Sequence, residues 1–403
     1  MKRVDDGATL PPTHTLGGDE SARLQSSPAP GGDERIRVAL IYGGTSGEHS
    51  ISCATAGAVM AALDPKRYDV VSIGIRRDGT WVPGESDPSK LQLGGATTEV
   101  ADSDERVIVP PGNGSSEWFA ACDSEQGMQL RSLGHIDVAF PLLHGPFGED
   151  GTIQGLFEMA NIPYVGCGVF ASAAGMDKHY MKIVLHDAGI PTTPSIAVTR
   201  QRWAVGRAGV LQDVASLGLP VYVKPARAGS SLGISRVDTI SQLDLAMETA
   251  HKHDPKVLIE AEVRGREIEC AVLGGHGVEP ARAASPGEVV LEARNAQFYD
   301  FEHKYVDTEE LRMQVPAHLD SEVTTRIQEM AVRAFDAFAC EGLARVDFFL
   351  TESGELLVNE INTMPGFTPF SMYPVMWEKT GLPYRSLVDE LITLALERGT
   401  GLR

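Results

Sequence analysis

The sequence predicts an α/β protein that opens with a Rossmann-like open sheet and continues as a two-part α+β domain. Three observations support this fold class. A strand, a glycine-rich turn and a helix follow one another at residues 35–63. Two strands enclose a second glycine-rich loop at residues 219–237, and a β-hairpin with polar side chains on one face spans residues 344–362. A chain of 403 residues is too long to fold around one ordinary hydrophobic core, so two or three domains are expected.

The predicted domains follow these features along the chain. Residues 1–34 are rich in Pro, Gly, Ser and acidic residues and are expected to form a disordered tail. Three ordered parts then follow: an N-terminal α/β domain at residues 35–172, a central subdomain at 173–258 and a C-terminal subdomain at 259–403.

Composition narrows the possible partners and the compartment. The net charge is −20 and no run of Lys and Arg occurs, which argues against nucleic acid or an anionic membrane as a partner. The five cysteines are widely spaced without a Cys-x-x-Cys pair, so neither a zinc site nor a disulfide framework is indicated. No apolar run reaches membrane-spanning length, and the first residues lack the apolar core of a secretory signal. We therefore expect a soluble cytoplasmic protein.

The N-terminal domain begins with a buried-type strand at residues 35–42. The turn Gly43–Glu48 follows, and helical spacing of apolar residues resumes at 51–63. In an open α/β sheet, ligands bind outside the carboxyl ends of the strands, which is where this turn lies. The next strand is predicted at residues 70–76.

A later strand at residues 136–142 delivers His144 into a second glycine-rich loop, and a helix is predicted at 152–160. Residues 83–133, which precede this strand, are polar and weakly patterned, so we expect an elaborated insertion there. Gly166-Cys-Gly168-Val-Phe-Ala171 matches a dinucleotide-binding fingerprint, but residues 172–188 read as one helix. Without a second strand to offer a carboxylate to a ribose, nicotinamide binding is disfavoured.

The central subdomain contains a candidate phosphate-binding loop. A strand at residues 219–225 ends with Lys224, and Gly229-Ser230-Ser231-x-Gly233 leads into a return strand at 234–237. Such a loop offers backbone N–H groups and hydroxyls to a phosphate, although a plain solvent-exposed turn has the same composition. A helix at 241–253 and strands at 256–260 and 267–273 follow.

The C-terminal subdomain carries the hairpin on which the site prediction depends. If its turn is centred between Ser353 and Gly354, Asp347 lies opposite Glu360 and Arg345 opposite Asn362. Two facing carboxylates repel each other unless a divalent cation such as Mg²⁺ binds between them. Arg345 suits a phosphoryl group or an oxyanion. The alternative is a solvated sheet face with ordinary ion pairs. The opposite, apolar face is predicted to hold Val346, Phe348, Leu350, Leu357 and Ile361.

Three further elements complete the C-terminal subdomain. Residues 292–316 are irregular and combine aromatic and charged side chains, which is typical of a loop that closes over an active site. Apolar residues at helical spacing predict core helices at 322–340 and 387–396.

Taken in chain order, these motifs closely resemble the D-alanine–D-alanine ligase family of ATP-grasp enzymes. The match runs from Arg35 to about Leu396, with only the tail and the 83–133 insertion outside it. The motifs that carry it are Gly43-Gly44-Thr45-Ser46-x-Glu48, His144-Gly-x-x-Gly-Glu-Asp-Gly151, Met176-Asp177-Lys178, Lys224-Pro-x-x-x-Gly-Ser-Ser231, Glu260-x(6)-Glu267, Tyr299-Asp300-x-x-x-Lys304-Tyr305, Ala344-Arg345-x-Asp347 and Asn359-Glu360-x-Asn362-Thr-x-Pro-Gly366.

The resemblance implies a reaction and a homodimer. ATP phosphorylates the carboxylate of one D-alanine, and the amine of a second D-alanine attacks the acyl phosphate to give D-alanyl-D-alanine for peptidoglycan precursors. The N-terminal domain would be a pre-ATP-grasp, substrate-binding domain, and residues 292–316 would be the lid loop of the C-terminal ATP-grasp subdomain. Other readings are a ligase for a different nucleophile, such as D-lactate, and a non-catalytic nucleotide-binding module, against which the full set of metal ligands argues.

The resemblance also assigns site residues. Two Mg²⁺ (or Mn²⁺) would be held by Asp347, Glu360 and Asn362. ATP would be bound by Lys178, Lys224, Ser230, Ser231, Glu260, Val263, Glu267, Phe298, Lys304 and Asn359. The first substrate would meet Glu48 and His144, the second Ser371 and Met372, and the oxyanion Arg345 and the Gly366 amide. Ser230 and Tyr305 would link Glu48 to the lid.

Overall fold

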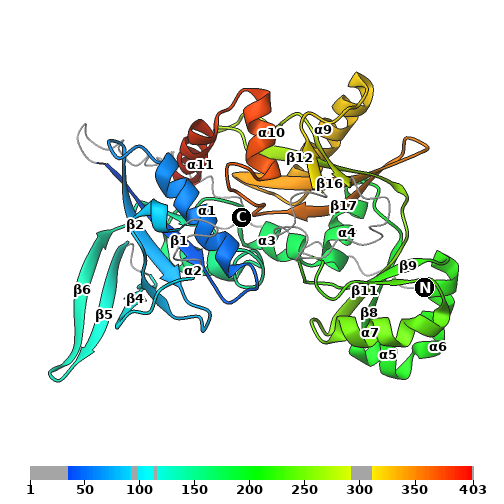
Figure 1. The fold of residues 1–403 in the computed structure, drawn as a ribbon, viewed down its shortest axis with the longest axis horizontal. Helices are drawn as coiled ribbons and strands as arrows, with labels where there is room; N and C mark the ends of the chain where they lie inside the picture. The colour runs from blue at the N-terminus through cyan, green and yellow to red at the C-terminus, as the bar shows by residue number, and fades with distance from the viewer. Residues whose placement is uncertain (1–34, 92–98, 113–115, 230, 292–310, 402–403) are drawn as a thin grey trace, which may run out of the picture. The chain divides into compact units, whose positions relative to one another are not determined.

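The computed structural model describes residues 35–91, 99–112, 116–229, 231–291 and 311–401. The predicted tail at 1–34, most of the predicted lid, and the site candidates Ser230, Phe298, Lys304 and Tyr305 lie outside the described residues. The described part is a mixed α/β protein, so the predicted fold class is confirmed (Figure 1). No helix in the described ranges is both long and apolar enough to cross a membrane.

The N-terminal sheet has the strand order β3-β2-β1-β7, with β1 parallel to β2 and to β7. Alternate residues of β1 serve two cores, because Val38 and Leu40 pack in one cluster with α1, whereas Ala39 and Ile41 pack in another with α2. The elements of this part are β1 (Ile36–Gly43), α1 (His49–Ala62), β2 (Tyr68–Ile75), β3 (Trp81–Pro83), η1 (Pro88–Lys90), β7 (Val138–Pro141) and α2 (Thr152–Ala160).

The insertion predicted at residues 83–133 contains a three-stranded antiparallel sheet that the sequence did not predict. Its strands, in the order β4-β5-β6, are β4 (Glu105–Ile108), β5 (Glu117–Ser124) and β6 (Gly127–His135). Nearly all of β6 is exposed on both faces, so its sequence lacks the alternation that marks a half-buried strand. Trp118 of β5 is fully buried and joins this sheet to the core around Ile41.

The single helix predicted at residues 172–188 is wrong, because the structure has two helices, α3 (Val169–Met176) and α4 (Lys178–Asp187). Asp177 between them is the N-cap of α4, and its carboxylate accepts hydrogen bonds from the backbone N–H groups of His179 and Tyr180 at 3.1 and 3.3 Å. The break places Lys178 at the first position of the second helix.

The central four-stranded sheet has the order β10-β9-β11-β8, and all its pairs are antiparallel. Its apolar face packs on α6 and α7. The strand β8 and the two helices that follow it were not predicted. The elements are β8 (Ser195–Thr199), α5 (Arg200–Val205), α6 (Arg207–Leu217), β9 (Val221–Pro225), β10 (Ser235–Val237), η2 (Ile240–Gln242), α7 (Leu243–His251) and β11 (Lys256–Ala261).

The C-terminal sheet has the order β15-β14-β12-β16-β17, with β13 paired to β12. Residues of β12 alternate between the core that contains α9, α3 and α4 and the core that contains α10 and α11. The elements are β12 (Gly265–Leu273), β13 (Arg282–Ala283), β14 (Gly287–Leu291), β15 (Leu311–Gln314), α9 (Ser321–Ala337), β16 (Leu343–Thr351), β17 (Leu356–Asn362), α10 (Met372–Thr380) and α11 (Tyr384–Arg398). The domain boundaries at 172/173 and 258/259 stay predictions.

Candidate active site

The hairpin β16–β17 places the predicted polar residues on one face. Asp347 lies opposite Glu360 and Arg345 opposite Asn362, so the predicted pairing is confirmed where the site lies. A β-bulge follows, since Phe348 pairs with Val358 and Asn359 is the extra residue on β17. The pairing from there to the turn is shifted by one residue. Leu357 therefore faces the same way as its partner Phe349, and its prediction as part of the apolar face is wrong.

A third carboxylate extends this pair into a row across three strands. Glu269 of β12 lies directly opposite Asp347, which lies opposite Glu360. Burial, opposed by Arg345 but reinforced by Glu269 and Glu360, raises the pKa of Asp347 to about 7. Glu269 was not among the predicted site residues, although its spacing of two from Glu267 places both side chains on one face of a strand.

Arg345 lies between two of these carboxylates. Its Nε is 2.7 Å from Asp347 Oδ1 and 2.9 Å from Glu269 Oε2, and its Nη2 donates to Asp347 Oδ2 at 2.7 Å. A guanidinium held by such a fork has a fixed direction. The side chains of Arg345 and Asp347 are each only 13% exposed, so these contacts are weakly screened by water.

Lys178 connects the carboxylate row to the glycine-rich loop that follows β9. Its Nζ lies 3.2 Å from Glu360 Oε2 and donates to the carbonyl of Ala228 at 3.1 Å. Its backbone N–H donates to the carbonyl of Ala226 at 2.9 Å. The loop ends at Gly233, where φ is +73° and a Cβ would lie 2.5 Å from the His253 ring, so glycine is required there.

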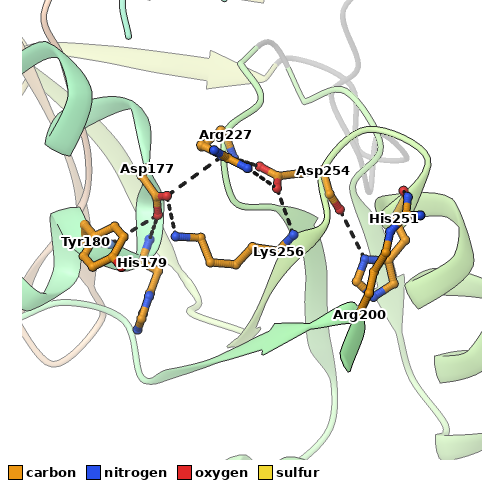
Figure 2. A network of polar contacts seen from close by, with 8 residues as sticks. All are labelled: Asp177, His179, Tyr180, Arg200, Arg227, His251, Asp254 and Lys256. Atoms are coloured by element: carbon orange, nitrogen blue, oxygen red, sulfur yellow. Dashed lines mark hydrogen bonds and ion pairs between the residues drawn. The ribbon is translucent and has the colours of Figure 1, made fainter. Parts of the chain in front are cut away.

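A network of ion pairs holds Arg227, near the start of this loop (Figure 2). The buried Asp254 accepts hydrogen bonds from the backbone N–H and the guanidinium of Arg227, each at 2.9 Å. Lys256 donates its backbone N–H to Asp254 at 2.8 Å and forms an ion pair with Asp177. The Lys256 Nζ also lies 4.2 Å from the centre of the Tyr180 ring. The turn before Lys178 and the loop after Lys224 are thus tied to the same strand.

Glu260 of β11 is buried between two lysines on different elements. Its carboxylate forms ion pairs with Lys224 of β9 and, at 2.6 Å, with Lys182 of α4. Burial alone would raise the pKa of Glu260, but Lys224 and Lys182 together lower it below its ordinary value. Lys182 was missed by the sequence analysis. The signal that could have found it is its position one helical turn after Lys178, on the same side of α4.

These elements enclose a cavity of about 520 Å³ between the central sheet and the C-terminal sheet. Residues of both sheets line it, and Glu269 is among them. Nine of the predicted site residues meet in its wall: Lys178, Lys224, Ser231, Glu260, Val263, Glu267, Asp347, Asn359 and Glu360.

The remaining described candidates lie outside the lining of this cavity. Gly145, next to the buried His144, approaches Glu48 so closely that a Cβ there would lie 3.8 Å from Glu48 Oε2. Burial lowers the pKa of His144, which favours the neutral imidazole. A Cβ on Gly366 would lie 3.3 Å from Ser371 Oγ, and Met372 is buried at the start of α10. The structure therefore forms two groups here, Glu48 with the His144 loop and Gly366 with Ser371.

The carboxyl group of Glu149 has a raised pKa, which makes stability depend on pH. Its Oε2 accepts a hydrogen bond from the Gly145 N–H at 2.6 Å. Burial, together with the charges of Glu48 and Glu360, raises its pKa to about 8 despite that hydrogen bond and Arg345. The folded state therefore retains a proton that the unfolded chain has released above its ordinary pKa of 4.5. The contribution to stability is present at acid pH and is lost as the pH rises towards 8, by up to about 1.4 kcal/mol per pH unit.

We expect Glu149→Gln, which keeps an acceptor and cannot ionise, to remove this loss. Urea unfolding at pH 5, 6.5 and 8 should show the variant gaining stability relative to the unmodified protein as the pH rises. Glu352→Gln at the exposed hairpin turn is the control and should follow the unmodified protein. Parallel stability curves for Glu149→Gln and the unmodified protein would contradict the raised pKa.

The residues of the carboxylate row fit a divalent cation. Negative charge is concentrated at Asp347, Glu360 and Glu269, and Arg345 and Lys178 are among the cations that compensate it. Asn362 donates its amide N–H to Asp347 Oδ2 at 2.9 Å, and a flip of this amide would present an oxygen instead. Within the described residues, no three His, Cys, Asp or Glu side chains converge as metal ligands. The fit therefore rests on the facing pair Asp347 and Glu360 together with the neighbouring amide of Asn362.

Comparison with known families assigns both halves of the chain. Residues 37–167 match the family described as D-ala D-ala ligase N-terminus, and residues 184–393 match the one described as D-ala D-ala ligase C-terminus. The first match spans residues 83–133, so the prediction that this insertion lies outside the resemblance is wrong.

Individual relatives agree with this assignment. The chain is 50% identical over 379 residues to the D-alanine–D-alanine ligase of Pseudarthrobacter chlorophenolicus, covering 94% of this chain and 98% of that protein. It is 52% identical over 367 residues to the ligase of the same name from Kocuria rhizophila, covering 91% and 95%.

Two solved structures are also similar. VanG D-Ala:D-Ser ligase from Enterococcus faecalis has a TM-score of 0.77 and 34% identity, covering 90% of this chain and all of that chain. The D-alanine–D-alanine ligase from Coxiella burnetii has a TM-score of 0.73 and 33% identity, covering 91% and 95%. With both halves matched and identity near one half over most of its length, the chain belongs to the D-alanine–D-alanine ligase family.

Proposed function

We propose that this protein joins two D-alanine molecules to D-alanyl-D-alanine at the expense of ATP. The γ-phosphoryl group of ATP passes to the carboxylate of the first D-alanine, and ADP remains. The amine of the second D-alanine then attacks the acyl phosphate, loses a proton, and expels phosphate as the peptide bond forms. The observation that carries this proposal is the cavity that combines a buried carboxylate row with lysines from two other elements.

Nucleotide binding is assigned to the cavity walls. Lys178 and Lys224 supply positive charge, and the loop to Ser231 supplies backbone N–H groups, which together suit a polyphosphate. Glu260 and the backbone at Val263 would meet the base, and Glu267 would meet the ribose hydroxyls, since all three residues line the cavity. Ser230, Phe298, Lys304 and Tyr305 keep their predicted roles as proposals from the sequence alone.

Metal binding is assigned to Asp347, Glu360 and Asn362. Two Mg²⁺ (or Mn²⁺) ions there would neutralise the phosphates and orient the transferred phosphoryl group. Arg345, whose orientation is fixed by Asp347 and Glu269, would stabilise the charge that develops on the reacting carboxylate.

Amino acid binding is assigned to the two remaining groups. Glu48 would pair with the ammonium of the first D-alanine beside His144, and Ser371 and Met372 would receive the carboxylate of the second. The Gly366 amide would donate to the developing oxyanion together with Arg345. We further propose a homodimer, and a cytoplasmic location, where ATP is supplied.

Phosphate release from ATP tests the function directly. With saturating ATP and Mg²⁺, we expect release with D-alanine, little with L-alanine, and weaker release when D-serine or D-lactate is offered as the second substrate. Chromatography of the products identifies which compound is formed. Robust synthesis of D-alanyl-D-serine or D-alanyl-D-lactate at pH 7 in preference to D-alanyl-D-alanine would overturn the proposed substrate, and no ATP turnover with any amino acid would overturn the reaction.

A further inference from the structure

Lys182 is a buried lysine to which the proposed reaction assigns no role. Its residue exposure is 7%, and its Nζ lies 2.6 Å from Glu260 Oε1 and donates to the Thr193 carbonyl at 2.9 Å. A lysine with so little access to water is costly unless its charge is compensated, and Glu260 provides that compensation. The pair joins helix α4 to strand β11, so it fixes one element against the other.

Lys182 does not line the cavity, but the two residues that it contacts do. Glu260 and Thr193 both line the cavity, whereas Lys182 is absent from its lining. The hydroxyl of Thr193, a residue only 2% exposed, has no hydrogen-bond partner among the described residues. A buried hydroxyl without a hydrogen-bond partner, close to a buried carboxylate at the wall of a cavity, is typical of a site that binds a polar group of a ligand.

Lys224 and Lys182, which both pair with Glu260, are expected to respond differently when a nucleotide binds. Lys224 lines the cavity and is available to a phosphate, so its pairing with Glu260 competes with the ligand. Lys182 cannot reach the cavity without leaving the Thr193 carbonyl and therefore stays with Glu260. Once Lys224 turns to a phosphate, Lys182 is the cation that keeps the buried Glu260 ionised and in place.

We propose that Lys182 is a positioning residue that keeps Glu260 an ionised acceptor for the amino group of adenine and so sets the preference of the site for adenine nucleotides. An ionised carboxylate accepts hydrogen bonds only. It therefore favours adenine, which carries an amino donor at C6, over hypoxanthine, which carries a carbonyl acceptor there. The inference rests on the proposed function, since it takes the cavity to be the ATP site.

Equilibrium binding without amino acids tests this, using isothermal titration of the full-length chain with ADP and with IDP. In the unmodified protein ADP should bind more tightly. Lys182→Met should reduce the ratio of ADP to IDP affinity about tenfold or more, the value of one charge-assisted hydrogen bond. Lys182→Arg, which keeps the cation, should retain most of the ratio. Lys252→Met on the exposed end of α7 is the control and should leave the ratio unchanged.

Turnover provides a second readout that a general loss of structure would not give. Lys182→Met should raise the KM for ATP while leaving both D-alanine KM values unchanged. If the single variant does not fold, the double variant Lys182→Met/Glu260→Gln removes both charges together and should bind ADP and IDP with similar affinities, because an amide can donate or accept.

The results that would contradict the role of Lys182 differ from those that would contradict the proposed reaction. An ADP-to-IDP ratio in Lys182→Met equal to that of the unmodified protein, or strong adenine preference in the double variant, would overturn the role of Lys182. Failure of the unmodified protein to make D-alanyl-D-alanine would instead overturn the proposed function, whatever the binding ratio.

Discussion

Asp347→Asn is expected to abolish turnover while leaving the fold intact. The side chain lies at the centre of the carboxylate row, between Glu269 and Glu360, and is the proposed ligand that contacts both metal and Arg345. Replacing a charged ligand by an amide should lower kcat at least about 100-fold, since even outer partners of metal ligands cost 10- to 100-fold when removed. Stability should be kept, because the substitution removes repulsion within the row and the amide oxygen still accepts from Arg345.

The measurement is phosphate release at saturating ATP, D-alanine and Mg²⁺, paired with thermal unfolding. Glu352→Gln, on the exposed turn of the same hairpin, is the matched control and should behave as the unmodified protein. Near-normal turnover by Asp347→Asn would show that the carboxylate row is a structural feature only.

Arg345→Met should lose both activity and stability, which separates it from Asp347→Asn. Methionine fills similar space but leaves Asp347 and Glu269 without their shared cation. Removing one partner of a buried ion pair costs about 3–5 kcal/mol of unfolding free energy. Loss of the proposed oxyanion contact should lower kcat by about 100- to 1,000-fold.

Urea unfolding and steady-state kinetics measure the two effects of Arg345→Met. Arg266→Met is the control for stability, because Arg266 forms a similar two-pronged pair with Glu288 at 2.7 Å but its side chain is 40% exposed. That pair should contribute no more than about 1 kcal/mol. Equal losses of stability in the two variants would contradict the buried, shared role of Arg345. Addition of Mg²⁺ should restore neither the stability nor the turnover of Arg345→Met.

The site could be predicted from sequence where a regular pattern fixes geometry. Alternation along two strands and a short polar turn were enough to pair Asp347 with Glu360, because a strand gives each side chain only two possible faces. The bulge at Asn359 could not be predicted, since one extra residue leaves no periodic signal, and Leu357 was assigned to the wrong face as a result.

Other misses have different physical causes. Lys182 has the sequence pattern of an ordinary helix residue, and its burial depends on a long-range ion pair with Glu260 of β11 that its spacing from Lys178 only hints at. The break at Asp177 is set by the hydrogen bonds of its own side chain, whereas the spacing of apolar residues on either side is that of one helix. The strand β6 lacks alternation because it is thinly covered on both faces. The roles of Ser230, Phe298, Lys304 and Tyr305 stay predictions.

The bulge at Asn359 also bears on how this hairpin tolerates changes in length. Pairing on its cavity side is set independently of pairing on its turn side, because the extra residue allows the two segments to differ in register. We therefore expect insertions or deletions between Thr351 and Glu355 to be absorbed before they reach Asp347 and Glu360. The length of the hairpin turn can therefore change while Asp347 and Glu360 stay opposite each other at the cavity.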